Sequence, residues 1–208
     1  MIIDTHVHIA DYSPCSNIKL EEAIIKAKKI GLDGLCITDH ESNYIEGKTK
    51  ELSKKHDFLI IVGMELLSYE GDILVFGLGK VPKNKMHDND LVKIVSEKGG
   101  ITISAHPFRD NGRGMGGHIK KVNRLSGIEA FNGNTEFHQN LQAYHLSKEL
   151  KLPCFGGSDA HKVEQIGKYA TFFEDEIKGV NDLIKAVKER RVYPIKYNSE
   201  KNIFGEVI

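Results

Sequence analysis

Histidine and carboxylate side chains recur in closely spaced pairs along this chain of 208 residues. His6 and His8 are two positions apart, and Asp159 and His161 repeat that spacing. In an extended segment, residues i and i+2 project to the same side, so each pair can present two ligand atoms together. Imidazole nitrogens combined with a few carboxylate oxygens suit Zn²⁺, Mn²⁺ or Fe²⁺. These residue types at this spacing therefore predict a divalent-metal site.

The pairs, together with Asp39-His40, Glu65 and His106, follow apolar runs that are typical of β-strands. A lone histidine after a strand is ordinarily a capping or surface residue. Parallel strands, however, bring their carboxyl ends to one face of an α/β fold, and five groups at such ends favour a common site. A carboxylate such as Glu65 is suited to bridging two ions. The site residues follow the segments Met1–Ile3, Gly34–Thr38, Phe58–Met64, Ile101–Ala105 and Pro153–Gly157. Within these segments, strands are expected at Met1–Ile3, Gly34–Ile37, Phe58–Val62, Ile101–Ile103 and Pro153–Phe155.

The elements that must position these residues alternate between apolar runs and amphipathic stretches. Further strands are expected at Ile73–Leu78, Gly127–Phe131, Tyr169–Phe173 and Val192–Ile195. Helices are expected from an Asn17 cap to Lys29, then over Asp90–Lys98, Asn140–Leu150 and Asn181–Arg191. Repeated strand–helix–strand order predicts one α/β domain over residues 1–208. The pattern fits either a compact βα barrel or an open doubly wound sheet.

Composition narrows the classes of protein. Lys and Arg number 29 and Asp and Glu number 29, so the formal charge is zero, and bulk binding of nucleic acid is not expected. No apolar run approaches the ~20 residues of a membrane-spanning helix, and the amino terminus does not read as a signal peptide. The three cysteines are scattered, which predicts a reduced, cytoplasmic protein. The sequence indicates no oligomeric state.

Five motifs occur in a characteristic order: Asp4-Thr5-His6-Val7-His8, Ile37-Thr38-Asp39-His40, Gly63-Met64-Glu65, Ala105-His106-Pro107 and Gly157-Ser158-Asp159-Ala160-His161. Together they resemble the PHP family, named for polymerase and histidinol phosphatase, over residues 4 to about 161. The resemblance implies a distorted (β/α)7 barrel, similar to a TIM barrel, with two or three divalent ions (Zn, Mn or Fe) at the carboxyl ends of the strands. It also implies phosphoester hydrolysis.

The resemblance assigns a ligand role to seven of these residues. His6 and His8 would hold one ion together with Glu65 and Asp159, and Glu65 would bridge to a neighbouring ion. The second ion would take His40 and His161, and a third position would take His106.

This sequence departs from the family pattern at several ligand positions. Ser13 stands where many members have an aspartate, with Asp11 close by but out of register. Asp72 stands where many have a histidine, and Asn132 lies where another ligand is common. We therefore regard Asp72, Asp11 and His138 as weaker metal-ligand candidates and leave the number of ions open.

The resulting hypothesis is a metal-dependent phosphoric ester hydrolase that cleaves a small phosphomonoester or nucleotide with a metal-bound hydroxide. Arg109 is the candidate cation for the transferred phosphoryl group, and Arg113 and Asn132 are further candidate substrate contacts. His161 is either a metal ligand or a general acid. The glycine-rich segment 111–117 is a candidate lid.

Two alternatives remain. An amidohydrolase that cleaves C–N bonds also begins with His-x-His after its first strand. The missing aspartate at Ser13 would alternatively fit a non-catalytic metal-binding scaffold.

Overall fold

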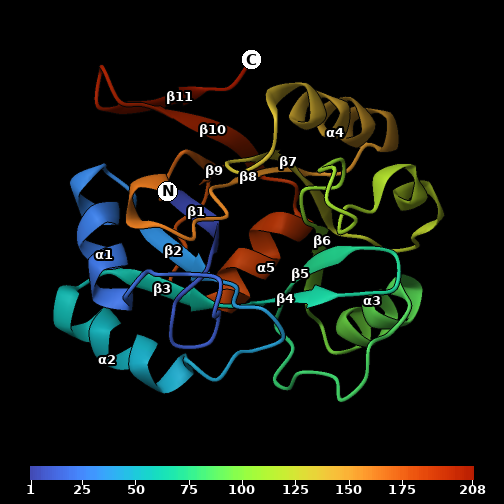
Figure 1. Ribbon diagram of the computed structural model, residues 1–208, viewed down its shortest axis with the longest axis horizontal. Coiled ribbons are helices and arrows are strands. Elements are labelled where there is room, and N and C mark those ends of the chain that lie inside the picture. The colour runs from blue at the N-terminus through green and yellow to red at the C-terminus, as the bar shows by residue number, and fades with distance from the viewer.

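The computed structural model describes residues 1–208 as a mixed α/β fold with two β-sheets (Figure 1). The strands are β1 (Ile2–Val7), β2 (Gly34–Ile37), β3 (Leu59–Val62), β4 (Met64–Leu67), β5 (Asp72–Phe76), β6 (Ile101–Ser104), β7 (Gly127–Asn132), β8 (Cys154–Gly157), β9 (Tyr169–Phe173), β10 (Val192–Asn198) and β11 (Ile203–Glu206). The helices are α1 (Leu20–Lys29), α2 (Glu46–His56), α3 (Asp88–Glu97), α4 (Phe137–Leu150) and α5 (Val180–Lys188), with 3₁₀ turns η1 (Gly116–Lys121) and η2 (Val163–Gln165).

Both sheets combine parallel and antiparallel pairs. The six-stranded sheet has the order β11-β10-β9-β1-β2-β3, in which β1, β2 and β3 are parallel. The five-stranded sheet has the order β4-β5-β6-β7-β8, in which β6, β7 and β8 are parallel. The expectation of a largely parallel sheet is therefore corrected at β4, β5, β9, β10 and β11, which all form antiparallel pairs.

The two sheets meet through short backbone bridges rather than a continuous ladder. Val7 at the end of β1 pairs with Ala160 after β8, and His40 pairs with Glu65 in β4. Both bridges join segments that carry site residues. They fix the ends of the two sheets against each other where the histidines lie.

Apolar side chains fill the space between the two sheets, and they also fill the space between each sheet and the helices that cover it. One buried cluster takes Ile3 from the first sheet, Phe76 and Phe155 from the second, and Leu183 and Val187 from α5. In Figure 1, α5 lies between the sheets. This packing leaves the other end of the sheets to the polar site.

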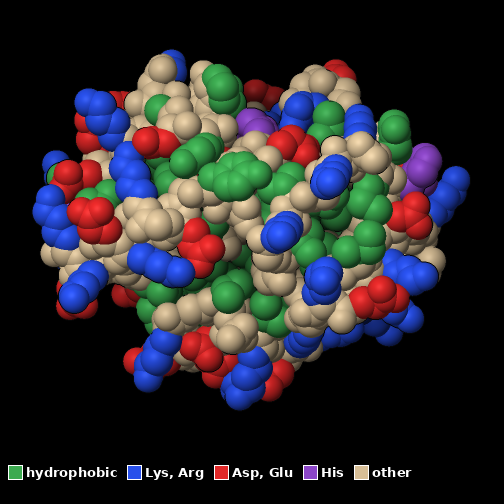
Figure 2. All heavy atoms as spheres, turned by 90° about the horizontal axis from the view of Figure 1, so that it is seen from below, with side chains coloured by type: hydrophobic (Ala, Val, Ile, Leu, Met, Phe, Trp, Pro, Cys, Tyr) green, Lys and Arg blue, Asp and Glu red, His purple; other side chains and the backbone are tan.

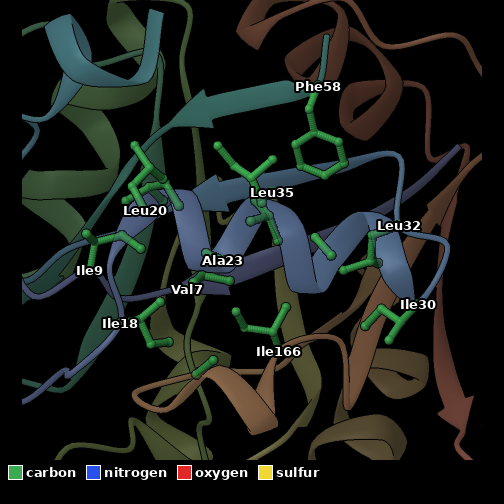
Figure 3. Close-up of a cluster of buried hydrophobic side chains, with 14 of the residues drawn as sticks. Val7, Ile9, Ile18, Leu20, Ala23, Ile30, Leu32, Leu35, Phe58 and Ile166 are labelled. Carbon is green, nitrogen blue, oxygen red and sulfur yellow. The ribbon is translucent and has the colours of Figure 1, made fainter. Parts of the chain in front are cut away.

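A second cluster forms where α1 covers β1 and β2 (Figure 3). Leu20, Ala23, Ile24 and Ala27 recur at helical spacing, and all four are buried. Burying such side chains contributes roughly 1–3 kcal/mol each. A third cluster packs α3 and α4 against the five-stranded sheet.

Several element boundaries differ from the sequence expectations. Helix α1 begins at Leu20 rather than after Asn17, and α3, α4 and α5 begin one to three residues earlier than expected. The expected strand Phe58–Val62 forms as β3, and a separate strand, β4, begins after Gly63, where a Cβ would lie 2.5 Å from the Phe76 ring. Glu65 consequently lies inside β4 and not at the end of β3.

The surface shows no large field of one charge on the face drawn in Figure 2, where Lys and Arg are interspersed with Asp and Glu around an apolar area. None of the helices has the length and apolar composition needed to cross a membrane.

Candidate metal centre

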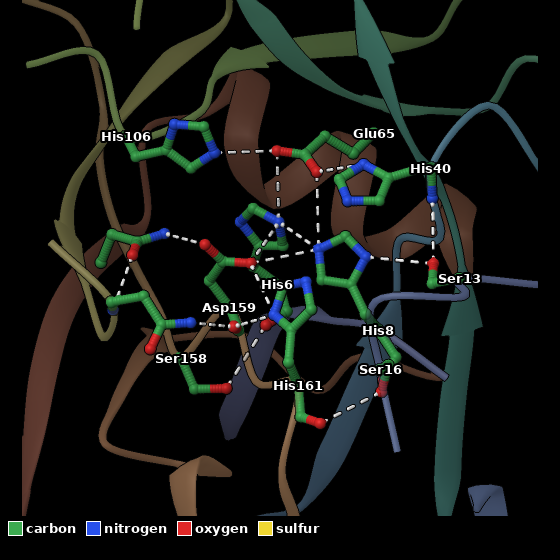
Figure 4. A network of polar contacts seen from close by, with 12 residues as sticks. His6, His8, Ser13, Ser16, His40, Glu65, His106, Ser158, Asp159 and His161 are labelled. Carbon is green, nitrogen blue, oxygen red and sulfur yellow. Dashed lines mark hydrogen bonds and ion pairs between the residues drawn. The ribbon is translucent and has the colours of Figure 1, made fainter. Parts of the chain in front are cut away.

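Strand β1 brings the first histidine pair into the centre of the site (Figure 4). His6 lies in β1 and His8 directly follows it, and both are fully buried. Their Nε2 atoms are 3.0 Å apart. The i, i+2 spacing thus places two imidazoles side by side, as the sequence predicts.

The Nδ1 partners of these two rings decide which nitrogen carries the proton. His6 Nδ1 lies 2.9 Å from Glu129 Oε1, a pure acceptor when ionised. His8 Nδ1 lies 3.3 Å from Ser13 Oγ, whose own proton goes to Asp39 Oδ1 at 2.7 Å. Both rings therefore donate from Nδ1, which leaves two Nε2 lone pairs facing each other. Such an arrangement requires a cation between them, either a proton or a metal ion.

Two carboxylates complete this cluster. Asp159 Oδ1 lies 3.4 Å from His6 Nε2 and 3.1 Å from His8 Nε2. Glu65 Oε1 lies 3.5 Å from His6 Nε2, and Glu65 Oε2 lies 3.5 Å from His8 Nε2. With metal–ligand bonds of about 2.0–2.1 Å, the ligand atoms around a tetrahedral ion lie about 3.3 Å apart. The separations of 3.0, 3.1 and 3.4 Å among His6 Nε2, His8 Nε2 and Asp159 Oδ1 match that edge, so these residues fit a divalent ion, with a Glu65 oxygen as a fourth ligand.

A second group consists of His8, His40 and His161, whose ligand atoms lie within 4.8 Å of one another. His161 Nδ1 donates to the Asp159 backbone oxygen at 2.9 Å, which leaves its Nε2 as a lone pair. His40 Nδ1 is 2.8 Å from Glu65 Oε2 but outside hydrogen-bond geometry. Both rings are thus oriented as ligands, and neutral His161 has no proton on Nε2 to donate as a general acid.

A third group joins Glu65, Asp72 and His106. His106 Nε2 lies 2.9 Å from Glu65 Oε1 and 3.7 Å from Asp72 Oδ2. Glu65 therefore contacts all three groups, in keeping with the bridging position that the resemblance implies. Asp72 also forms a two-point ion pair with Arg113, at 2.6 and 2.9 Å.

The electrostatics of the centre follow from burial and close charge. Burial alone disfavours a charged imidazole, but Glu129, Asp159 and Glu65 together hold the pKa of His6 well above its ordinary value. Burial lowers the pKa of His8 to about 4. Against the cost of burial, the neighbouring histidines hold the carboxyl pKa values of Glu65 and Asp159 well below their ordinary ranges. The site thus keeps its carboxylates ionised and one imidazole neutral.

The backbone at two of these residues adopts an unusual conformation. His106 and Asp159 have φ angles of +29° and +52°, in the left-handed region that non-glycine residues rarely occupy. Main-chain hydrogen bonds hold both: His106 donates to Glu129 Oε2 at 2.9 Å, and Asp159 donates to the His6 oxygen at 2.7 Å. Local strain of this kind is characteristic of functional sites.

Two aspartates from the motifs support the centre without joining it. Asp4 accepts backbone hydrogen bonds from Ser158 and Gly167, and burial raises its pKa to about 6. Asp39 Oδ1 accepts from the Ile9 backbone and from Ser13, and burial likewise raises the pKa of Asp39 to about 6. Asp4 thus fixes the segment between β8 and β9, and Asp39 fixes the loop that follows β1.

The candidate substrate residues are engaged within the protein. Arg109 donates from Nη2 to Asp159 Oδ2 and to Asn132 Oδ1, each at 2.5 Å, and from Nε to Thr135 at 3.0 Å. Asn132 is completely buried. Arg109 and Asn132 therefore hold the second oxygen of Asp159, which lies between the site and this network.

The glycine-rich segment 111–117 is anchored at its centre. The Arg113 oxygen accepts from the Asp72 backbone at 2.8 Å, and a Cβ on Gly114 would lie 2.4 Å from the Pro107 oxygen. Gly112, Gly116 and Gly117 have open space around them, and the lid stays a prediction.

Two weaker ligand candidates lie apart from the centre. Asp11 forms a partly exposed ion pair with Lys48 at 2.7 Å, and His138 is exposed on the first turn of α4. The structure brings neither of them to the cluster.

Glu129 is the polar residue that the sequence interpretation missed. Its carboxylate is completely buried and accepts from His6, from the His106 backbone and from Asn132, all at 2.9 Å. A charged residue within the apolar run Gly127–Phe131 was the available signal.

Two sequence comparisons find similar proteins. A family model described as PHP-associated matches residues 137–192. An uncharacterized protein from Methanocaldococcus jannaschii is 35% identical over 137 residues, which cover 62% of this chain and 76% of that protein.

Solved structures share the fold at low identity. A protein from Bifidobacterium adolescentis described as a metal-dependent phosphoesterase has a TM-score of 0.65 at 14% identity, covering 76% of this chain and 87% of that one. A protein from Chromobacterium violaceum described as an amidohydrolase, with bound sulfate and no metal, has a TM-score of 0.65 at 15% identity, covering 92% and 97%. Together with the order of the ligand motifs, the match to the PHP-associated model shows that the chain belongs to the PHP family.

Proposed function

We propose that this protein is a metal-dependent hydrolase that cleaves a small phosphomonoester or a nucleotide. The observation that carries the proposal is the cluster of His6 Nε2, His8 Nε2 and Asp159 Oδ1, separated by 3.0–3.4 Å, with the two Glu65 oxygens each 3.5 Å from one of the nitrogens. The two facing Nε2 lone pairs support a cation at their centre.

The proposed ligand sets share residues. The first ion takes His6, His8, Glu65 and Asp159, a second takes His40 and His161, and Glu65 with His106 supplies a third position, to which Asp72 is adjacent. When bound, divalent ions at such a site lower the pKa of a coordinated water and neutralise charge on a phosphoryl group. Zn²⁺, Mn²⁺ and Fe²⁺ all suit these nitrogen and oxygen donors.

The remaining residues orient the ligands. Glu129 fixes the ring of His6, and Ser13 with Asp39 fixes the ring of His8. Arg109 holds the second oxygen of Asp159, which keeps its first oxygen turned toward the histidines. Fixed orientation of this kind supports transition-state stabilisation because little reorganisation is then needed during the reaction.

The proposal extends to the architecture. The backbone bridges at Val7–Ala160 and His40–Glu65 join the sheets at two seams, and this supports one domain built as a distorted (β/α)7 barrel. Such a barrel would collect the parallel strand ends around the proposed ions.

The test is hydrolysis by protein stripped of metal and then supplied with Mn²⁺ or Zn²⁺. The substrate panel contains aryl phosphates, mononucleotides and, for the C–N alternative, amides. We expect metal-dependent release of phosphate that is lost in His8→Ala and in Glu65→Ala but retained in His138→Ala, the control at an exposed histidine. Undiminished activity in metal-free protein would contradict the proposal. Cleavage of amides alone would assign the site to an amidohydrolase, and a metal-loaded protein inert toward the whole panel would assign it to a scaffold.

A further inference from the structure

A second group of possible ligand atoms lies outside the site described above. Glu70, Asp88 and His118 each offer one atom, and these atoms lie within 4.8 Å of one another. The residues come from three separate segments: the turn between β4 and β5, the first residue of α3, and the 3₁₀ turn η1. No ligand of the first centre belongs to this group.

Asp88 is the buried member, with 2% of its surface exposed. Its Oδ1 accepts from the Asn89 backbone, whereas Oδ2 has no hydrogen-bond partner. His118 Nε2 lies 2.8 Å from that same Oδ2, outside hydrogen-bond geometry. A buried carboxylate oxygen this close to an imidazole nitrogen, without a hydrogen bond between them, is the arrangement of two ligands directed at one ion.

The charge of the group points the same way. Glu70 pairs with His87 at 2.5 Å, and its second oxygen accepts from the Asp88 backbone at 2.8 Å. Asp88 pairs with no Lys or Arg, and its one ion-pair contact is His118. Burying a carboxylate without a compensating charge is costly. A divalent cation would supply that charge.

We propose that Glu70, Asp88 and His118 form a second divalent-cation site that takes an ion of the Zn²⁺ class. One nitrogen and two carboxylate donors suit such an ion and leave a position for water. The ion would tie the β4–β5 turn to α3 and η1. Its role is to hold these segments together, because none of its ligands reaches the first centre.

The test counts tightly bound metal. Wild-type protein and the variants His118→Gln, Asp88→Asn and His138→Gln are stripped, equilibrated with Zn²⁺, dialysed and analysed by inductively coupled plasma mass spectrometry. We expect His118→Gln and Asp88→Asn to lose about one equivalent relative to wild type, as for removal of a ligand from a three-residue site. His138→Gln, which changes an exposed histidine, should lose none. Equal Zn²⁺ content in wild type and His118→Gln would overturn the proposal.

A second measurement covers misfolding and separates this site from the first. His118 is partly exposed, so His118→Gln should fold, as circular dichroism will verify. Added Zn²⁺ should raise the melting temperature less in His118→Gln than in His138→Gln, while any metal-dependent hydrolysis stays unchanged. An equal increase in both variants would contradict the proposal even if no substrate were ever found, because this readout does not depend on hydrolysis.

Discussion

Replacing Glu129 by Gln tests whether this carboxylate orients the His6 ring for metal binding. The carboxylate accepts from three donors: His6 Nδ1 on Oε1, and the His106 backbone and Asn132 Nδ2 on Oε2. A glutamine has the same shape but carries one amide NH₂. In either orientation that NH₂ meets a donor, so at least one of these buried hydrogen bonds is lost.

The expected magnitude follows from those contacts. A hydrogen bond to a charged group contributes about 1.5–3 kcal/mol, and removal of a group that orients a metal ligand typically costs 10–100-fold in metal affinity. Since each tenfold change is about 1.4 kcal/mol, the two ranges agree. We therefore expect metal affinity to fall about 10–100-fold in Glu129→Gln.

The assay is competition between stripped protein and a chelator of known Zn²⁺ affinity. Glu149→Gln, in which an exposed ion pair with Lys120 is lost, is the matched control and should bind as wild type does. A folded Glu129→Gln protein with wild-type affinity would show that the buried carboxylate does not orient His6 for metal binding.

Three further predictions concern stability and reactivity. Ser13→Ala removes the hydroxyl that links Asp39, His8 and the His40 backbone, and should reduce the free energy of unfolding by about 1–3 kcal/mol in urea titrations; unchanged stability would contradict this role. Gly127→Ala places a Cβ 2.3 Å from the Phe155 ring and should lower the free energy of unfolding by about 1–3 kcal/mol. Gly47→Ala, in α2 with open space around it, should raise the free energy of unfolding by about 0.5 kcal/mol. A Gly127→Ala protein more stable than Gly47→Ala would refute the packing argument. Iodoacetamide at pH 8 should modify exposed Cys15 and spare buried Cys36 and Cys154. Burial raises the pKa of Cys154 to about 11 and that of Cys36 well above its ordinary value, so both thiols stay protonated. Detection of modified Cys36 in native protein by mass spectrometry would contradict this prediction.

Much of the strand framework is predictable from apolar runs. Gly34–Ile37 and Tyr169–Phe173 form strands with the expected bounds, because their residues are buried and β-prone. The close approach of Gly63 to the Phe76 ring was not predictable, because it joins two different strands' surroundings. The antiparallel pairing of β4 with β5 was likewise not evident from the apolar runs.

The missed elements lack a strong local pattern. Helix α2 buries only Thr49 and Leu52 among charged residues, so its apolar face is too narrow to stand out. Strand β11 is mostly exposed, and its pairing with β10 is what defines it.

The candidate site was predictable at the level of ligand types. Two-residue spacing and position after strands identified His6, His8 and Asp159, which lie together in the structure. The partners that orient them were not predictable, because Glu129 and Arg109 reach the centre from distant segments. Asp11 shows the reverse: it lies three residues after His8 in the sequence, but its side chain pairs with Lys48.

Anomalous diffraction at the zinc edge, from crystals grown with Zn²⁺, tests the central claim most directly. We expect a peak between His6 Nε2, His8 Nε2, Glu65 and Asp159, at about 2.0–2.2 Å from the ligand atoms. Crystals that hold zinc elsewhere but show no density among these four residues would contradict the account.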